Sequence, residues 1–465
     1  MEMRSREDAT RRNARFAFAS FFVFMLLHQT DKLLIGPLQD QIMESFKINY
    51  TQWGLVNTVA IVVGAVFYPL WGWLYDHYAR PKLLALASLI WGCTTWLNAI
   101  APTYPVFLMT RASTGVDDSS YPGIFSLISD YYPPKKRGKM YGLLQVAQPL
   151  GYLVGMVLAI ILGAAWGWRK IFYLTGGLGV LLAAVISFRV KDQPRGAAEP
   201  ELEGVQHLEK FKFSWKTVGG LFRKKSLIIL FLQGFIGVFP WQVITYYIFG
   251  YLGKNGRGFE GNEVLFAMVP AILLMAAGYP LGGVLGDKLF KRTPKGRVIV
   301  GAAGVALGAI LLYAAIKVPY ADKLGFGLLL AAASLFIPFA SPNVISSFYD
   351  VTEPEIRATT NAAQNFIETA GSAAAPLLAG ILADRTSVEN AIVVICGGAW
   401  ALCFAFFVFA GRYIPKDIED LKAKLKGRAA DAGLAGTSGA GAAGLAAAGA
   451  GAADKTGAAG PGKGE

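Results

Sequence analysis

The chain has 465 residues, of which 54% are hydrophobic and only 16% are charged, and its mean hydropathy is +0.43. Soluble domains carry about 25% charged residues, so this composition excludes a disordered chain, a disulfide scaffold and most soluble enzymes. The net charge of +13 would suit a nucleic-acid partner, but the distribution of the basic residues makes such a partner unnecessary.

Twelve apolar segments are long enough to cross a membrane, which requires roughly 20 mostly apolar residues each. Such lengths favour helices over the strands of about ten residues found in membrane barrels. No small-residue cleavage site follows the first segment, so we expect it to remain as a spanning helix. The predicted helices cover residues 15–38, 52–75, 83–101, 104–132, 139–163, 170–188, 226–252, 262–286, 298–317, 323–349, 359–382 and 388–414.

The basic residues lie mainly on one side of this topology. With the N-terminus inside, the external loops hold eight of the 44 Lys and Arg residues, and 34 lie in cytoplasmic segments. This asymmetry follows the positive-inside rule and accounts for the net charge. It predicts a multi-pass protein of the cell membrane with both termini in the cytoplasm, surrounded by lipid and without a nucleic-acid partner.

A long charged loop divides the predicted helices into two groups of six. The tail is rich in Ala and Gly, and we expect it to be disordered from about residue 428. The predicted units are a cytoplasmic segment, a first bundle, a central cytoplasmic loop, a second bundle and a cytoplasmic tail, at residues 1–14, 15–188, 189–225, 226–414 and 415–465.

The two halves of the chain repeat each other. Residues 68–76 and 279–287 are identical at six of nine positions. Five further positions match at an offset of 220, among them Asp130 with Asp350. Two matches in the same order at the same predicted membrane face indicate duplication of a six-helix unit, which is an architecture of transporters.

The repeated segment resembles the loop 2–3 signature of the major facilitator superfamily, and Arg111-x-x-x-Gly115 resembles its helix 4 motif. The resemblance implies two pseudo-symmetric bundles of six helices, alternating access, a working monomer and no cofactor. Asp31-Lys32 in helix 1, together with an acidic helix 4, looks most like the Spinster-type and anion–cation symporter branches. The residues that carry the doubled loop motif are Gly72, Asp76, Arg80, Lys82, Gly283, Asp287, Lys291 and Arg292.

This doubled motif is expected to act as a cytoplasmic latch. Asp76 and Asp287 each end a spanning helix, where a carboxylate can cap the exposed amides of a neighbouring helix. The basic residues can bridge to nearby acids or carbonyls, and Gly72 and Gly283 allow close helix approach. The alternative is a plain helix end with solvated charges.

Ionisable residues inside the spanning helices are costly and therefore mark a candidate functional site. Asp31 and Arg111 lie at the same predicted depth, which permits an ion pair, and Arg111 could instead bind an anionic substrate. Asp118 shares the helical face of Arg111, whereas Asp117 points about 100° away. Asp31 could load a proton when Arg111 changes partner; the alternative is a permanent structural pair.

Further polar residues extend this candidate site. His28 shares the face of Asp31 and either carries a proton or donates to a carbonyl. Lys32 either snorkels outward or pairs with an acid, and Glu368 is either functional or a satisfied structural acid. Side chains that could line a pore, or that form hydrogen bonds between helices, are Gln145, Gln148, Gln233, Trp241, Gln242, Tyr246, Asn343, Asn361, Gln364 and Asn365.

Together these features predict a secondary transporter for a small solute, an organic anion in particular, coupled to protons by symport. Glycines of helix 5 resemble an antiporter motif, but Met156 stands where that motif has Pro, which favours symport. The alternatives are a proton-antiport exporter of drug-like or lipid substrates and a non-transporting sensor. The sequence has no Walker-type phosphate loop and no paired-Cys or His-Glu-x-x-His metal pattern, so we expect neither an enzyme nor a metal site.

Overall fold

The computed structural model describes residues 2–120, 131–132, 134–190, 224–253, 256–352 and 357–450. This part of the chain is almost entirely helical and contains no strand, so the predicted all-helical membrane class is confirmed. Ten of its helices are long and apolar enough to span a membrane, or eleven if α1 and α2, which meet at 53°, form one span.

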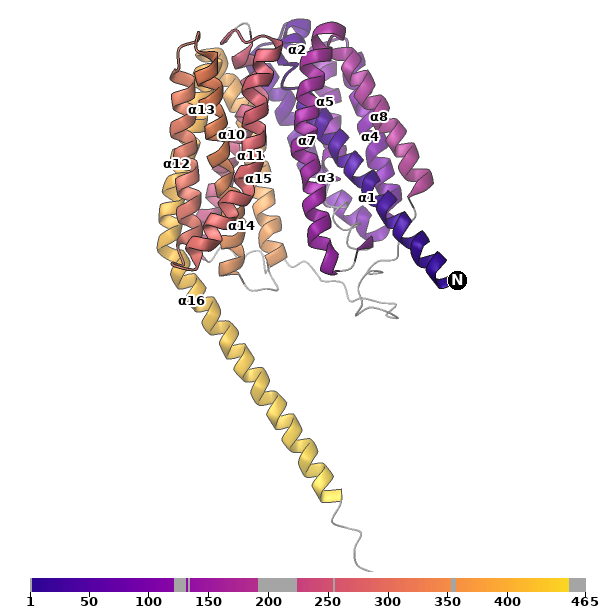
Figure 1. Cartoon of the computed structure of the whole chain (residues 1–465), viewed down its shortest axis with the longest axis vertical. Coiled ribbons are helices and arrows are strands. Elements are labelled where there is room, and N and C mark those ends of the chain that lie inside the picture. The colour runs from indigo at the N-terminus through magenta and orange to yellow at the C-terminus, as the bar shows by residue number, and fades with distance from the viewer. Residues whose placement is uncertain are drawn as a thin grey trace, which may run out of the picture.

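The first half of the chain forms one group of helices (Figure 1). Its central loop and residues 121–130 lie outside the described residues. The helices are α1 (Glu2–Leu34), α2 (Gln39–Phe46), α3 (Tyr50–His77), α4 (Arg80–Ile100), α5 (Tyr104–Asp118), α7 (Pro134–Trp166) and α8 (Trp168–Arg189).

The second half forms the other group, beside the first (Figure 1). The N-terminus and the far end of α16 lie at the same end of the molecule. The helices are α10 (Lys225–Leu252), α11 (Gly261–Phe290), α12 (Gly296–Lys317), α13 (Lys323–Phe336), the 3₁₀ turn η2 (Ile337–Phe339), α14 (Ala340–Val351), α15 (Arg357–Arg385) and α16 (Val388–Ala450).

Two predicted spans are interrupted near a proline. The helix expected over residues 15–38 ends as α1 at Leu34, just before Pro37, and the chain turns into α2. The span expected over residues 323–349 is α13 and α14, joined by η2 around Pro338. Each break lies next to a proline, which lacks the amide hydrogen and crowds the preceding turn.

The tail departs from the prediction. We expected no regular structure from about residue 428, but α16 continues to Ala450. Alanine has the highest helix propensity of all residues, and here it outweighs the interspersed glycines.

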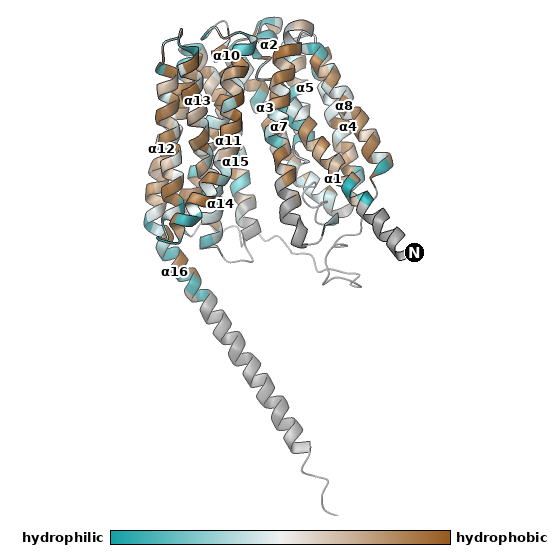
Figure 2. Ribbon diagram, viewed as in Figure 1, coloured by the Kyte–Doolittle hydropathy of each residue, from teal (hydrophilic) through white to brown (hydrophobic). Residues whose placement is uncertain are grey.

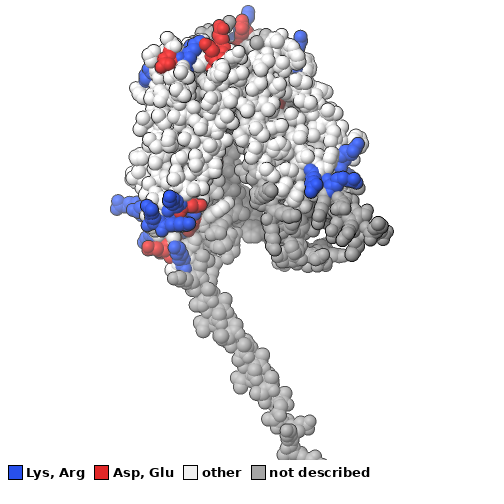
Figure 3. All heavy atoms as spheres, in the orientation of Figure 1, with Lys and Arg blue, Asp and Glu red and all other residues white. Residues whose placement is uncertain are grey.

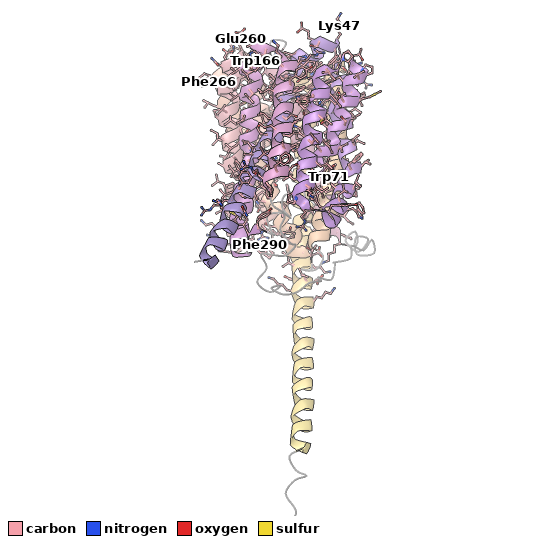
Figure 4. The ribbon with its side chains drawn as sticks, turned by 90° about the vertical axis from the view of Figure 1, so that its right-hand side faces the viewer. Lys47, Trp71, Trp166, Glu260, Phe266 and Phe290 are labelled. Atoms are coloured by element: carbon pink, nitrogen blue, oxygen red, sulfur yellow. The ribbon has the colours of Figure 1, made fainter. Side chains whose placement is uncertain are left out.

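Charged side chains gather at the two ends of the bundles and leave an uncharged band between them (Figure 3). Hydrophobic residues cover the helices along this band (Figure 2). Lys47 and Glu260 mark the end at which the charge rule predicts the external loops, and Phe290 lies toward the opposite end (Figure 4). We call these the outer end and the inner end.

The hydrophobic core joins the two halves at the outer end. One cluster of buried side chains contains Trp53 and Phe107 of the first half together with Tyr247 and Ile392 of the second half. A separate cluster, which includes Phe21 and Leu84, belongs to the first half alone. The halves therefore share a core near the outer end and have separate cores elsewhere.

Candidate functional site

Four ionisable side chains from α1 and α5 form one connected network. His28 Nε2 lies 3.0 Å from Asp117 Oδ2 and 3.4 Å from Asp118 Oδ1. The second carboxylate oxygen of Asp118 lies 3.4 Å from Lys32 Nζ. The sequence predicted all four as candidates, but it placed Asp117 on a different face from Asp118. At the end of α5 both carboxylates reach the same imidazole.

Glycines bring the neighbouring helices close to this network. A Cβ on Gly115 of α5 would lie 2.6 Å from the amide nitrogen of Gly64 in α3. On α7, a Cβ at Gly151 or Gly155 would meet the backbone of α1 near Thr30 at 2.5–3.1 Å. Side chains at these positions would push the helices apart, so the glycines fix the spacing of α5 against α3 and of α7 against α1.

Asp31 has partners other than the one expected from the sequence. Its carboxylate accepts hydrogen bonds from Trp91 Nε1 at 3.0 Å, Thr95 Oγ1 at 3.0 Å and Thr175 Oγ1 at 2.6 Å. The expected ion pair with Arg111 is not among the ion pairs of the described residues. Sequence reasoning missed the three donors, although polar hydrogens in apolar helices, on two Thr hydroxyls and one Trp indole, were the signal that could have revealed them.

Arg111 is a buried cation that is not neutralised by a close ion pair in the described part of the chain. Only 7% of its surface is exposed, and its Nε has no hydrogen-bond partner there. Asp118, which lies further along α5 toward its C-terminal end, is close enough to attract the Arg111 guanidinium electrostatically. A guanidinium in this state can bind a carboxylate or sulfonate through its planar fork.

A polar cavity of about 170 Å³ lies between the two halves, next to the network. Four of the predicted pore residues line it, together with Lys32. The sequence missed Gln29, Tyr152 and Thr245. The full lining is Gln29, Lys32, Leu33, Gln148, Tyr152, Trp241, Gln242, Thr245 and Tyr246.

An apolar pocket of about 80 Å³ adjoins the polar cavity. Tyr152 of α7 and Trp241 of α10 line both spaces, and their ring centroids are 5.7 Å apart. Met268, Met275 and Leu330 of the second half line the apolar side. The two rings therefore stand where a polar chamber meets an apolar one.

The other predicted pore residues whose side chains the structure describes do not line either space. Gln233 is buried against Cys403, and the Asn343 side chain donates to the carbonyl of Gly282 at 2.9 Å. Gln364 donates to Glu368 on the same helix, and Asn365 is exposed. The side chains of Gln145 and Asn361 lie outside the described residues.

Three groups of the network have the residue types of a metal site. Ligand atoms of His28, Asp117 and Asp118 lie within 4.8 Å of one another. The ammonium group of Lys32 already lies 3.4 Å from Asp118, and it would repel a metal cation there. The donor set therefore fits protons better than a metal ion.

The inner-end motif is built differently from the expected latch. Arg297 Nη2 donates to Asp287 Oδ1 at 3.0 Å, and Nη1 donates to Asp350 at the end of α14. The expected partners Lys291 and Arg292 are exposed instead. Arg297 of α12 thus links Asp287 of α11 to Asp350 of α14. The sequence analysis selected Asp287 but not Arg297.

The first-half copy of this motif is only partly described. Arg80 Nε donates to the carbonyl of Tyr75 at 3.4 Å, and Lys82 is exposed. The side chain of Asp76 lies outside the described residues. Close helix approach occurs at Gly282 rather than at the predicted Gly72 or Gly283: a Cβ there would lie 2.6 Å from Phe339 Cα.

At the outer end, polar contacts tie the two halves together. The Asp384 carboxylate accepts from the amides of Tyr50 at 2.9 Å and Thr51 at 2.7 Å. Thr58 Oγ1 donates to the carbonyl of Ala373 at 2.7 Å, and Trp53 Nε1 donates to that of Tyr246 at 3.1 Å. These contacts join α3 of the first half to α15 and α10 of the second.

Comparison with known proteins gives a consistent result. The sequence profile of the Major Facilitator Superfamily matches residues 17–376. Protein spinster of Drosophila melanogaster is 28% identical over 394 residues, which cover 82% of this chain and 64% of that protein. A probable sulfoacetate transporter of Cupriavidus necator is 26% identical over 407 residues, 84% of this chain and 93% of its own.

A solved structure shares the fold. It is that of a bacterial homolog to the human lysosomal transporter Spinster, in an inward-facing and unoccupied conformation. The TM-score is 0.77 at 19% identity, and the match covers 87% of this chain and 98% of the other.

Proposed function

This chain belongs to the major facilitator superfamily, and we propose that it is a secondary transporter that carries a small organic anion across a membrane together with protons. Membership of this family also supports the expectation that the chain is not an enzyme. The two halves would rock about the central cavity to expose it to each side in turn.

The observation that carries the proposal is the Lys32–Asp118 pair beside the polar cavity. Lys32 lines the cavity and lies 3.4 Å from Asp118. An anion that binds the Lys32 ammonium competes with Asp118 for it. A carboxylate deprived of its cation inside a membrane is costly, so Asp118 takes up a proton as the anion binds. Anion and proton then travel in the same direction.

Two further features support an organic anion as the substrate. Arg111 adds a second cation to the site without a close acidic partner among the described residues. The cavity also supplies amide and hydroxyl groups, such as Gln148 and Gln242, that can orient a carboxylate or sulfonate. The relative in Cupriavidus necator is named for sulfoacetate, an anion of this chemistry.

We further propose that the chain works as a monomer in the cell membrane. Residues 15–188 and 226–414 would each supply six spanning helices, with both termini in the cytoplasm. The exclusion of charged side chains from the middle band supports a membrane-embedded body (Figure 3). The second candidate function is a proton-antiport exporter, which the apolar pocket behind Tyr152 and Trp241 favours because it could hold an apolar substrate.

The test uses purified protein in proteoliposomes that contain a pH-sensitive dye. External sulfoacetate, or one of a set of small carboxylates, should acidify the lumen. In Asp118→Asn this acidification should fall at least about tenfold, while exchange of labelled anion across the membrane is retained. Asp322→Asn, an external residue outside the site, serves as the matched control.

Each other outcome has a distinct meaning. Alkalinisation of the lumen would replace symport by antiport and favour the exporter. An unchanged proton flux in Asp118→Asn would contradict the role given to this residue. Absence of any solute flux across the whole set would contradict transport of small organic anions.

A further inference from the structure

The pair formed by His28 and Asp117 is more deeply enclosed than the pair formed by Asp118 and Lys32. The side chains of His28 and Asp117 are 3% and 2% exposed, against 22% for Asp118 and 37% for Lys32. Phe24 stacks on the imidazole at 5.6 Å between ring centroids. The network thus has a part that reaches the cavity and a part closed off from it.

The distances around the imidazole require a hydrogen atom between Nε2 and the carboxylate oxygens. Nε2 of His28 lies 3.0 Å from one carboxylate and 3.4 Å from a second. A bare imidazole nitrogen and an ionised carboxylate oxygen are both acceptors. At hydrogen-bonding distance they therefore need a hydrogen between them, supplied by the imidazole or by a carboxyl group. The same nitrogen faces Asp117 and Asp118, so a proton can pass from one carboxylate to the other through this atom.

The charges near the imidazole favour the binding of an additional proton. The carboxylates are Asp31, Asp117 and Asp118, and the cations are Lys32 and Arg111, so a neutral His28 leaves one uncompensated negative charge among the described groups. An uncompensated charge in a low-dielectric interior is costly, and one proton removes it. The remaining groups that face this region from α4, α7, α8 and α10 are uncharged: Trp91, Thr94, Thr95, Tyr152, Thr175 and Tyr246.

We propose that His28 and Asp117 form a proton-binding site of their own, which exchanges protons with the cavity through Asp118. Asp118 holds Lys32 with one oxygen and faces His28 with the other, so it lies between the enclosed pair and the cavity. The use of this proton in transport rests on the proposed function, but the site can be tested without any substrate.

The test is nuclear magnetic resonance of the full-length protein in lipid nanodiscs. The chain has only three histidines, so ¹⁵N-histidine labelling gives few imidazole signals, and loss of one in His28→Gln identifies His28. Its ¹⁵N shifts distinguish the charged from the neutral ring. We expect a charged ring at pH 7 in the wild type. Asp117→Asn should lower the ratio of charged to neutral ring at least about tenfold, as expected when a contacting carboxylate is removed.

Asp118→Asn is the matched variant, because it removes the other carboxylate near the same nitrogen. Because it also removes one of the three carboxylates, it should lower the ratio of charged to neutral ring, but by less than Asp117→Asn, since Asp118 lies 3.4 Å rather than 3.0 Å from Nε2. It should also slow proton exchange, so that separate charged and neutral lines replace one averaged line during a pH titration. An averaged line that persists in this variant would overturn the exchange route through Asp118.

The site itself has equally clear opposing outcomes. A ring that stays neutral from pH 7 to pH 5 in the wild type would overturn the proposal, even if Asp117→Asn failed to fold. A ratio that is unchanged in a folded Asp117→Asn protein would overturn it as well. A charged His28 in a protein that moves no solute would leave this site intact and contradict only the proposed function.

Discussion

At the scale of single residues, Asp31 and Asp118 differ in how their carboxylates are held. Asp31 receives three hydrogen bonds from α4 and α8, which stabilise a fixed carboxylate and hold three helices together. Asp118 faces His28 with one oxygen and holds Lys32 with the other at the edge of the cavity. A carboxylate with three fixed donors suits a structural role, whereas one with a replaceable partner suits proton exchange.

The replacement Asp31→Asn should therefore destabilise the protein. The amide would present hydrogens to at least one of the three donors, and a buried hydrogen bond lost in this way costs about 1–3 kcal/mol. The midpoint of thermal unfolding in detergent should fall clearly, and Thr175→Val, which removes one donor, should show a smaller decrease. An unaltered midpoint for Asp31→Asn would refute the structural role.

At the scale of elements, the start of α3 is capped from the other half of the molecule. Asp384 at the end of α15 accepts from the amides of Tyr50 and Thr51, and the dipole of α3 favours a negative charge there. Within its own half, α3 is also capped by Asn49. Since a cap across the halves exists only while they touch, Asp384 couples a helix end to the closed state of the outer end.

We expect Asp384→Asn to increase the population that is open at the outer end. The loss of a charged cap costs about 0.5–2 kcal/mol, enough to raise a minor open state severalfold. Spin labels on Lys47→Cys and Asn262→Cys, one at the outer end of each half, should show an added longer distance.

The matched control for this experiment is Asp322→Asn. Asp322 caps α13 through the amide of Gly325, but this contact lies within the second half. It should leave the distance distribution unchanged. Equal distributions in the wild type and in Asp384→Asn would show that the cap across the halves does not hold the outer end closed.

At the scale of the whole molecule, the described contacts between the two halves gather near the outer end. Their shared hydrophobic core and the polar contacts of α3 lie near the outer loops. We therefore expect the cavity to open toward the inner end, which the basic residues predict to be the cytoplasmic side.

A cysteine in the cavity should therefore be reached from one side of the membrane only. With Cys93, Cys396 and Cys403 replaced, Gln148→Cys should react with a membrane-impermeant thiol reagent added to the cytoplasmic side and not to the external side. Lys47→Cys should show the reverse. Labelling of Gln148→Cys from outside alone would contradict either the orientation or the closed outer end.

The sequence was sufficient for the all-helical membrane class and for all four members of the ionisable network. Hydropathy gave the helices, and the cost of charge in a membrane selected His28, Asp31, Lys32, Asp117 and Asp118 before any contact was known. The pairing of these residues was not predictable. Which acid meets Lys32 depends on the rotation of α1 against α5 and on hydroxyl donors from α4 and α8, and neither is encoded in spacing along one helix.

The outer contacts were missed for a related reason. Asp384 follows a predicted span, and an acidic residue at such a position is expected to be a solvated side chain at a helix end. Its partners are main-chain amides of Tyr50 and Thr51, more than 300 positions away in the chain. Side-chain patterns carry no information about an acceptor or donor that belongs to the backbone.

That use of the backbone has a consequence for how this protein tolerates mutation. In the contacts that Asp384, Thr58, Trp53 and Tyr247 make at the outer end, the other atom is a peptide amide or carbonyl. Most substitutions at the partner position keep that backbone atom. Only the residue that contributes its side chain is therefore sensitive to substitution in each of these contacts. A deep mutational scan should show isolated intolerant positions here, without the paired compensating changes that mark contacts between two side chains.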